Sequence, residues 1–213
     1  MRKKDLFLVL VVIVVIILFI IVGNIKNNKK PSINSSNGEV KEDQNLLSGK
    51  HYVVIDVKNY GKIKLELDAD EAPITVTNFI NLVNDKFYDG LTFHRIIEGF
   101  MIQGGGYEID GTRKNAKTIK GEFAQNNVKN SILHKRGVIS MARATNMNSA
   151  SSEFFIMHED DDYLDGNYAA FGKVISGMEV VDKIATAARP IDKNGSISLN
   201  DRPVIKSIRV VES

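Results

Sequence analysis

Residues 93–105 read FHRIIEGFMIQGG, and this stretch decides how the fold is interpreted. Apolar residues dominate it, yet Arg95 stands within the first apolar run and Gln103 follows the second. Alternate side chains of a strand share a face, so Met101 and Gln103 are expected on the same side. Arg95 adds a permanent charge on a planar group. Taken alone, the pattern also fits a surface arginine on a half-exposed strand, with Phe100 in a plain core.

The sequence on either side of this stretch predicts mostly short strands. Residues 51–57 form a β-branched run and residues 62–67 alternate strictly, with turn residues between them, which predicts a hairpin. Further strands are expected at 91–97, 100–103, 137–142, 153–157, 171–175 and 204–211. Many short strands without a regular alternation of strand and helix favour a closed or sandwich-like antiparallel architecture.

Two helices are expected among these strands. The first begins near Pro73, a residue favoured in the first helical turn, and Asp70 or Glu71 is expected to cap it. Its apolar residues recur at helical spacing and form one buried stripe, made of Val76, Phe79, Ile80 and Val83. The second helix covers residues 178–187.

The N-terminal part of the chain differs from the rest. Residues 6–22 are all apolar, and as a helix they would span roughly 26 Å, close to the thickness of a bilayer core. Basic residues flank this run on both sides. The sequence therefore predicts an uncleaved signal-anchor over residues 1–25, with one transmembrane helix. A flexible polar linker over residues 26–48 and a folded domain over residues 49–213 follow it.

The apolar run also bears on where the protein works. Its place at the extreme N-terminus, behind a short basic leader, favours a single-pass cell-membrane protein with an extracytoplasmic domain. The alternative is a cleaved signal peptide and a secreted protein. The run is longer than the apolar region of an ordinary signal peptide, and no small-residue cleavage site follows Val22.

Composition excludes several function classes. The chain has no cysteine, which excludes disulfides, thiolate metal sites and a cysteine nucleophile. The net charge is +2, and its basic excess lies in the first 50 residues, so no nucleic-acid partner is expected. The four histidines lack metal-ligand spacing, Gly104–Gly106 belong to no phosphate-binding loop, and no G-x-S-x-G is present. We therefore expect no metal and no cofactor.

Four motifs together resemble the signature series of the cyclophilin-type peptidyl-prolyl cis-trans isomerases. They occur in family order, and they are FHRIIEGFMIQGG at 93–105, GVISMARA at 137–144, SSEFFI at 151–156 and YLDGNYAAFGKV at 163–174. The resemblance extends from about Lys50 to the C-terminus. It implies a closed eight-stranded antiparallel β-barrel with two capping helices and an active groove on the outer face of the barrel.

The resemblance also implies site residues, position by position. Arg95 matches the catalytic arginine, and Gln103 matches the polar residue beside the substrate carbonyl. The residues that match the lining of the proline pocket are Phe100, Met101, Phe155 and Leu164. The segment whose backbone engages the peptide is matched by Ala142, Arg143 and Ala144.

Three positions depart from the common family pattern. Tyr163 stands where many members have tryptophan, and Tyr168 stands where many have histidine, which keeps an aromatic wall. Glu153 replaces a glutamine and places a carboxylate that is expected to pair with Arg95 or to tune it.

The expected function is therefore an anchored isomerase that accelerates X-Pro rotation in proline-containing polypeptides and assists the folding of exported proteins as a chaperone. We expect the domain to be monomeric. The alternative, kept open by Glu153, is a non-catalytic module or holdase that binds proline-containing segments.

Overall fold

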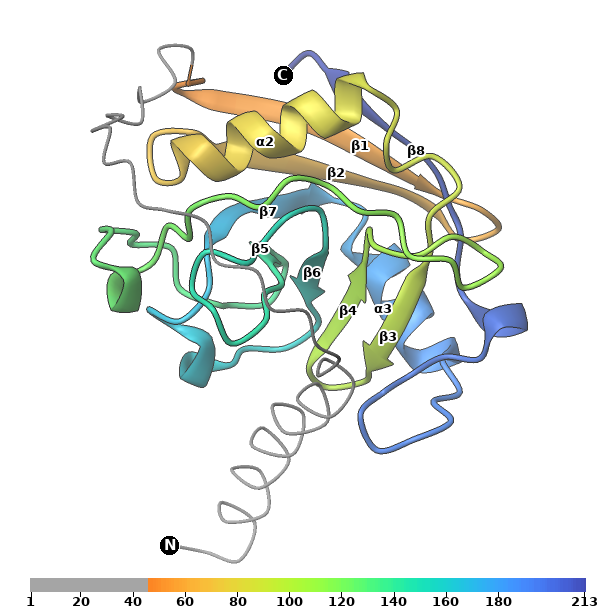
Figure 1. Cartoon of the computed structure of the whole chain (residues 1–213). Helices are drawn as coiled ribbons and strands as arrows, with labels where there is room; N and C mark the ends of the chain where they lie inside the picture. Colours follow the sequence, from red (N-terminus) through yellow and green to blue (C-terminus); the bar gives the residue numbers. More distant parts are fainter. Residues whose placement is uncertain (1–45) are drawn as a thin grey trace, which may run out of the picture. The chain divides into compact units, whose positions relative to one another are not determined.

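The computed structural model describes residues 46–213 (Figure 1). The predicted signal-anchor and nearly all of the predicted linker lie outside these residues. A compact unit covers residues 47–213, and its first residue, Leu47, donates its backbone N–H to Thr77 Oγ1 at 2.9 Å. Within residues 46–213, no helix is long and apolar enough to cross a bilayer.

Eight strands form one curled sheet in which every neighbouring pair is antiparallel. The mainly β prediction is confirmed, and the ends of each expected strand differ from the observed ends by at most two residues. Across the sheet, the strands are β3 (Phe93–Ile97), β4 (Met101–Gly104), β6 (Phe154–Met157), β5 (Val138–Met141), β7 (Ala170–Ser176), β2 (Gly61–Asp68), β1 (Lys50–Val57) and β8 (Ile205–Val211).

The sheet is a curled half-barrel, so the prediction of a closed barrel is wrong. Strands β3 and β8 are not paired with each other. Each one bonds only the segment that precedes the other, because the Phe93 N–H donates to Pro203 O at 2.9 Å and the Ile205 N–H donates to Leu91 O at 2.7 Å. The rest of the β3 edge is occupied by the loop around residue 195, because the Ile96 N–H donates to Gly195 O at 2.8 Å. An edge that is already paired has no backbone groups left for β8.

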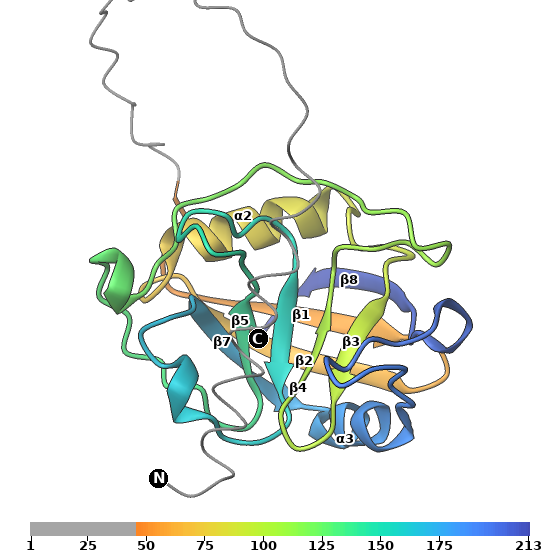
Figure 2. The same cartoon turned by 60° about the horizontal axis from the view of Figure 1, so that its bottom comes forward.

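Two α-helices lie at opposite ends of the curled sheet, as Figure 2 shows. They are α2 (Pro73–Asn84) and α3 (Met178–Ala187), and both helix predictions are confirmed. The expected stripe of α2 is buried. Three short 3₁₀ turns complete the described elements, at Ala124–Asn126, Asp162–Leu164 and Leu199–Asp201.

The cap of α2 differs from the prediction. Ala72 occupies the N-cap position and makes no side-chain cap bond. The buried carboxylate of Glu122 instead accepts the Ile74 N–H at 3.0 Å and the Thr75 N–H at 2.8 Å. Glu71 accepts from Ser131 in a different loop. A side chain 47 residues away in sequence thus supplies the acceptors that the helix start requires.

The strands nearest the candidate site carry apolar residues on both faces. Along β6, Phe154 and Ile156 belong to the main core inside the curl, whereas Phe155 and Met157 belong to a second apolar cluster on the outside. This second cluster is called the outer cluster below. Its buried members are Met101, Val138, Phe155, Met157 and Ala170.

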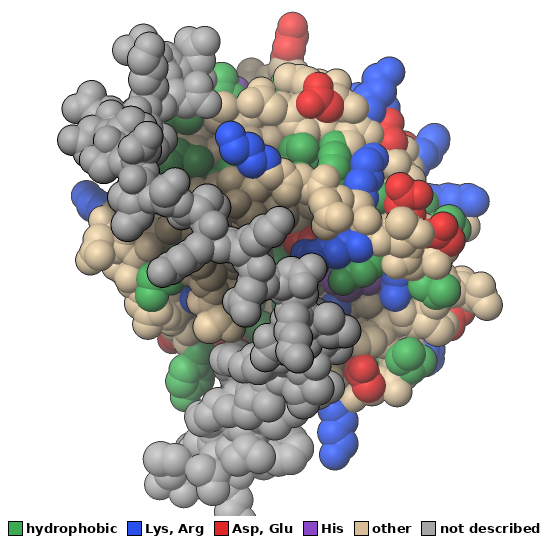
Figure 3. All heavy atoms as spheres, viewed as in Figure 1, with side chains coloured by type: hydrophobic (Ala, Val, Ile, Leu, Met, Phe, Trp, Pro, Cys, Tyr) green, Lys and Arg blue, Asp and Glu red, His purple; other side chains and the backbone are tan. Residues whose placement is uncertain are grey.

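Charges are interspersed on the surface. On the face of residues 46–213 that Figure 3 shows, Lys and Arg side chains alternate with Asp and Glu side chains, and no patch of one sign stands out. This face therefore offers no basic track of the kind that nucleic acids require.

Candidate active site

The register of β3 and β4 brings Arg95 and Gln103 together. The two residues are direct cross-strand partners, and Arg95 Nη1 donates to Gln103 Oε1 at 3.3 Å. Met101 lies on the same face as Gln103, as the alternation predicted, and its sulfur is 3.7 Å from Arg95 Nη1. The Arg95 guanidinium lies 5.9 Å from the centre of the Phe100 ring. Four residues of the stretch 93–105 therefore lie together in one local cluster.

A second contact holds Arg95 from the opposite side. Its Nε donates to the backbone carbonyl of Asn194 at 2.7 Å. The loop that presents this carbonyl is stabilised by Asp192, which accepts the backbone N–H groups of Asn194 and Ser196. Gly195 has φ +85°, and a Cβ there would lie 2.7 Å from Ile96 O, so only glycine fits. Sequence reasoning missed this loop, although its Asp-Lys-Asn-Gly series has turn chemistry.

The Arg95 side chain is partly shielded from water. Burial lowers the pKa of Arg95, and the negative charge of Asp192 opposes this shift. A guanidinium remains protonated in proteins all the same, so the group is a permanent donor. Its third nitrogen, Nη2, makes no hydrogen bond with any residue of the range 46–213.

The apolar residues implied for the proline pocket come together beside Arg95. Met101 and Phe155 are buried members of the outer cluster, and the Phe155 ring meets the Tyr168 ring edge to face at 5.8 Å. Several partly buried residues pack against this cluster, among them Phe100, Ala142, Leu164 and Tyr168. Val138 and Met157 belong to it as well. Sequence reasoning missed them, although extending the alternation from Phe155 by two residues leads to Met157.

The buried side chain of His134 packs against Phe155 of the outer cluster. The ring of His134 lies nearly parallel to that of Phe155, at 19° and 6.0 Å. Its Nδ1 is 2.9 Å from Asp165 Oδ1, and its Nε2 is 3.0 Å from Ser140 Oγ. Burial lowers the pKa of His134, so the neutral ring donates to Asp165 and accepts from Ser140. The spacing of the histidines in the sequence excluded a metal site but did not indicate this packing role of His134.

The segment implied for peptide binding lies at the rim of the cluster. The Arg143 guanidinium lies 4.8 Å from the Tyr168 ring, and its Nε donates to Asn167 O at 2.9 Å. Ala144 is exposed. Tyr163 is 76% exposed and does not belong to the outer cluster. The fold therefore does not bring this implied site residue into the apolar surface beside Arg95.

Glu153 does not contact Arg95 directly, so the expected ion pair does not form. Its carboxylate accepts from Gln103 Nε2 at 3.1 Å and from Arg113 Nη2 at 3.1 Å. It also lies 3.5 Å from His94 Nε2. Gln103 therefore stands between the carboxylate and Arg95, with its oxygen toward the arginine and its nitrogen toward Glu153. The sequence could not reveal Arg113, which lies 40 residues from Glu153.

His94 adds a second buried imidazole near this network. Burial, together with the positive charges of Arg202 and Arg95, lowers the pKa of His94 to about 4. The ring packs against Tyr107 with 4.6 Å between the ring centres. At neutral pH the residue is therefore uncharged and acts as a polar spacer.

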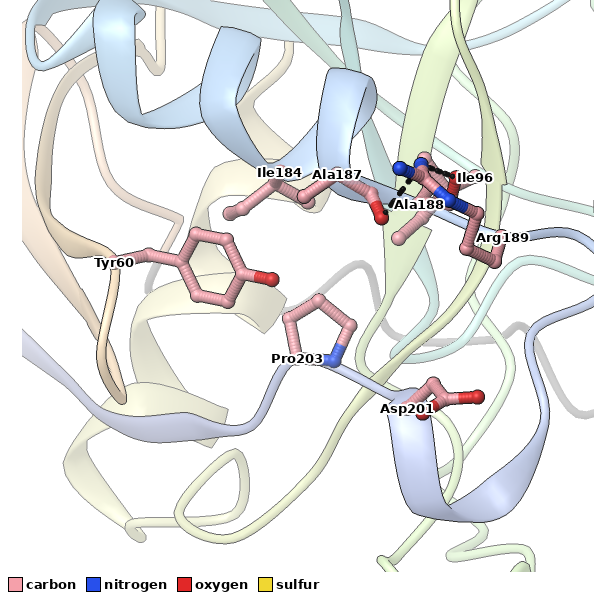
Figure 4. A pocket seen from close by; sticks show the side chains of 8 residues that line it. All are labelled: Tyr60, Ile96, Ile184, Ala187, Ala188, Arg189, Asp201 and Pro203. Carbon is pink, nitrogen blue, oxygen red and sulfur yellow. Dashed lines mark hydrogen bonds between the residues drawn. The ribbon is translucent and has the colours of Figure 1, made fainter.

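A hollow in the surface lies apart from these residues. It measures about 290 Å³ and lies at the C-terminal end of α3, as Figure 4 shows. Tyr60, Ile184 and Pro203 line it, and none of the implied site residues does. Over residues 46–213, no group of three or more His, Asp or Glu side chains is arranged to hold a metal ion.

Comparisons with known proteins agree with the resemblance. The family model of cyclophilin type peptidyl-prolyl cis-trans isomerases matches residues 52–212. A peptidyl-prolyl cis-trans isomerase of Acinetobacter baylyi is 47% identical over 133 residues, which cover 60% of this chain and 68% of the relative. One from Helicobacter pylori is 43% identical over 148 residues, which cover 68% of this chain and 86% of the relative.

Solved structures give the same answer. A crystal structure of a Cryptosporidium parvum cyclophilin type isomerase has a TM-score of 0.64 at 30% sequence identity, and covers 78% of this chain and 99% of its own. A second structure, in the presence of the dipeptide Ala-Pro, has a TM-score of 0.62 at 30% identity, and covers 76% of this chain and 99% of its own. The chain therefore belongs to the cyclophilin-type peptidyl-prolyl cis-trans isomerase family.

Proposed function

We propose that X-Pro bonds isomerise against the outer cluster, with Arg95 as the catalytic residue. Family membership establishes the reaction, and the geometry supports this site for it. The observation that carries the proposal is a guanidinium fixed on two sides, by Asn194 O and Gln103 Oε1, beside an apolar cluster. Arg95 Nη2 donates to no residue in the range 46–213, so we expect its hydrogens to meet the substrate.

The reaction needs a lower rotational barrier and no new bond. Peptide resonance places roughly 18–20 kcal/mol in the path of rotation, whereas the two X-Pro isomers differ by only about 0.5–1 kcal/mol. When the bond is twisted, the prolyl nitrogen regains its lone pair. A donor aimed at this nitrogen therefore stabilises the twisted state more than either planar state. Arg95 is such a donor.

The other residues orient the substrate. The outer cluster supplies an apolar surface for the proline ring, with Phe100, Met101 and Phe155 beside Arg95. The low polarity of this surface strengthens the contact between guanidinium and nitrogen. Gln103 holds Nη1, and we expect it to contact a neighbouring peptide group. Along the rim, the N–H groups of Ala142 and Ala144 already donate to Glu153 O and Ser149 Oγ, so the Arg143 N–H is the group of this segment that we expect to meet the peptide.

Proline-containing polypeptides are the substrates that this surface fits. The pyrrolidine ring is compact and apolar and lacks an N–H, so it loses little on entering an apolar pocket. One structural relative was solved in the presence of Ala-Pro, a dipeptide of this kind. No cofactor takes part, because the step transfers neither electrons nor a chemical group.

Substitution of Arg95 tests the site. Exchange of a short blocked peptide with one X-Pro bond is measured by NMR, with the full chain in detergent micelles. Arg95→Ala is expected to lower kcat/KM by at least about 100-fold, and Arg95→Lys is also impaired because a flexible point charge lacks the planar fork. Arg209→Ala is the matched control, since Arg209 lies on β8 and pairs with Asp89.

The outcome separates the candidate functions. Full activity of Arg95→Ala would contradict the proposed site. A chain that binds the peptide without accelerating its exchange would instead be a holdase.

We also propose that residues 6–22 anchor the protein in the cell membrane and that the isomerase domain works outside the cytoplasm on exported proteins. The support is the uninterrupted apolar run and its basic flanks. After cell fractionation, the full-length chain is expected in alkali-washed membranes, and external protease is expected to digest it in spheroplasts. A soluble product whose N-terminus begins after Val22 would indicate the secreted form.

A further inference from the structure

The turn between β3 and β4 carries Phe100, and the side chain of His158 binds the backbone of this turn. The Gly99 N–H donates to His158 Nδ1 at 3.0 Å. The backbone N–H of His158 donates in turn to Phe100 O at 2.8 Å. His158 therefore binds the backbone both before and after the Gly99–Phe100 peptide unit. Its side chain is 12% exposed, whereas Gly99 lies at the surface.

The contact with Gly99 fixes the protonation of the ring. A backbone N–H can only donate, so Nδ1 must carry a lone pair. The single proton of the neutral ring then lies on Nε2, which is 3.4 Å from Asp182 Oδ1 on α3. The carboxylate of Asp182 thus favours the tautomer that accepts from Gly99.

The charged groups around His158 form one network. Arg136 binds both oxygens of Asp182, at 2.7 and 2.8 Å, and its Nη1 donates to His158 O at 2.6 Å. Glu159 lies 3.8 Å from Arg136. On the turn itself, Glu98 accepts from Thr186 Oγ1 of α3 at 3.1 Å. The Gly99 N–H is connected to α3 through a different route, by way of His158 and Asp182.

The last residue of the turn is Phe100, which belongs to the proposed site. Phe100 packs against the outer cluster, and its ring lies 5.9 Å from the Arg95 guanidinium. Gly99 has φ +78°, and a Cβ built there would meet no atom within 4 Å, so nothing packs on the turn at this position. The hydrogen bond to His158 is therefore the side-chain contact that fixes the Gly99 amide.

We propose that His158 is a positioning residue that holds Phe100 against Arg95 through the Gly99 amide. The inference rests on the proposed function of the outer cluster. A residue that does not touch the substrate then sets the geometry of the site.

Two isosteric variants separate the two ring nitrogens. In His158→Asn the amide oxygen takes the place of Nδ1, so it accepts from Gly99. In His158→Gln the amide reaches the place of Nε2 and leaves Gly99 without an acceptor. The full chain in detergent micelles is tested by NMR exchange with a blocked peptide that has one Ala-Pro bond and no ionisable group. Thermal melting reports the folded fraction of each variant.

The expected pattern is specific. His158→Asn keeps the wild-type kcat/KM within about twofold, because it keeps an acceptor for the Gly99 N–H. His158→Gln lowers kcat/KM about fivefold, which corresponds to the loss of one hydrogen bond. Rescue by His158→Asn and not by His158→Gln is a result that a general loss of packing would not produce.

Opposite results overturn the inference. A folded His158→Asn whose kcat/KM falls as far as that of His158→Gln does so, and so does a folded His158→Gln with wild-type kcat/KM. Should His158→Gln fail to fold, His158→Ala, which also lacks an acceptor for the Gly99 N–H, takes its place. A wild-type chain that does not accelerate exchange would overturn the proposed function and this inference together, whereas the other results affect the inference alone.

Discussion

Two adjacent phenylalanines on β6 face two different surroundings. Phe154 lies inside the curl, where its ring meets those of Phe79 and Tyr88 edge to face at 5.6 Å each. Phe155 lies on the outside, stacked on His134 and edge to face with Tyr168. Both side chains are almost completely buried. Burial alone therefore does not distinguish a core residue from a site residue in this protein.

The difference lies in the polar groups that accompany each face. The ring of Phe154 is enclosed by apolar and aromatic side chains, so its burial contributes mainly to stability. The outer cluster borders Arg95 and Gln103, which stay hydrogen-bonded at its edge. In the proposed function, this apolar surface with a fixed donor beside it binds the proline ring. We therefore expect one face of β6 to serve stability and the other to serve activity.

The strongest test of this division substitutes each phenylalanine in turn. Phe154→Ala is expected to lower the free energy of unfolding by about 3–5 kcal/mol, because it opens a cavity in a close-packed core. Phe155→Ala is expected to cost less stability but to lower kcat/KM about tenfold, mainly through KM. Urea denaturation and NMR exchange measure the two effects. Equal losses of activity per folded molecule in both variants would contradict the division of the faces.

A second test sharpens the comparison through pH. The folded pKa of His94 is about 4, below its ordinary value of 6.5, so protons bind the unfolded chain more readily. The stability that results is present above about pH 6.5 and is lost as the pH falls toward 4. The loss amounts to about 3 kcal/mol.

His94→Gln provides the reference for this measurement, since it keeps a polar side chain but cannot titrate. Between pH 7 and pH 4 the wild type should lose about 3 kcal/mol more unfolding free energy than the variant. Parallel denaturation profiles would show that His94 is not held neutral. Other acid-sensitive groups, such as His134, are present in both chains and cancel.

The smallest expected effect concerns Glu153. Glu153→Gln keeps an acceptor for Gln103 and removes the charge that faces Arg113, a residue whose side chain is 54% exposed. Exposed ion pairs contribute little, so stability should change by less than about 1 kcal/mol and kcat/KM by less than about threefold. A tenfold change in kcat/KM would mean that the carboxylate acts on Arg95 through Gln103.

Sequence periodicity predicted the local elements well because it reports local geometry. Strict alternation over residues 62–67 and the helical stripe from Val76 to Val83 each require one backbone conformation, and both elements form as expected. The motif order likewise led to the family and to Arg95, Gln103 and Phe155. These residues meet because β3, β4 and β6 are neighbouring strands, and their register places Arg95 opposite Gln103 and Gln103 opposite Phe155.

Other features escaped the sequence because their partners are distant. Glu122 caps α2, Asn194 O holds Arg95, and the loop at Gly195 occupies the edge that would have closed the barrel. In each case a single polar group pairs with another far along the chain, and neither leaves a periodic trace. Glu153 illustrates the point, since its charge suggested Arg95 as a partner and the fold supplied Arg113.

The sequence by itself thus determined the strands, both helices, the family and the residue types of the site. Only the tertiary structure decided which face of each strand became core, which groups orient Arg95, and how His158 reaches Gly99. The physical reason is that backbone conformation follows from neighbouring residues, whereas the partner of a polar side chain depends on which distant atoms the folded chain brings within about 3 Å.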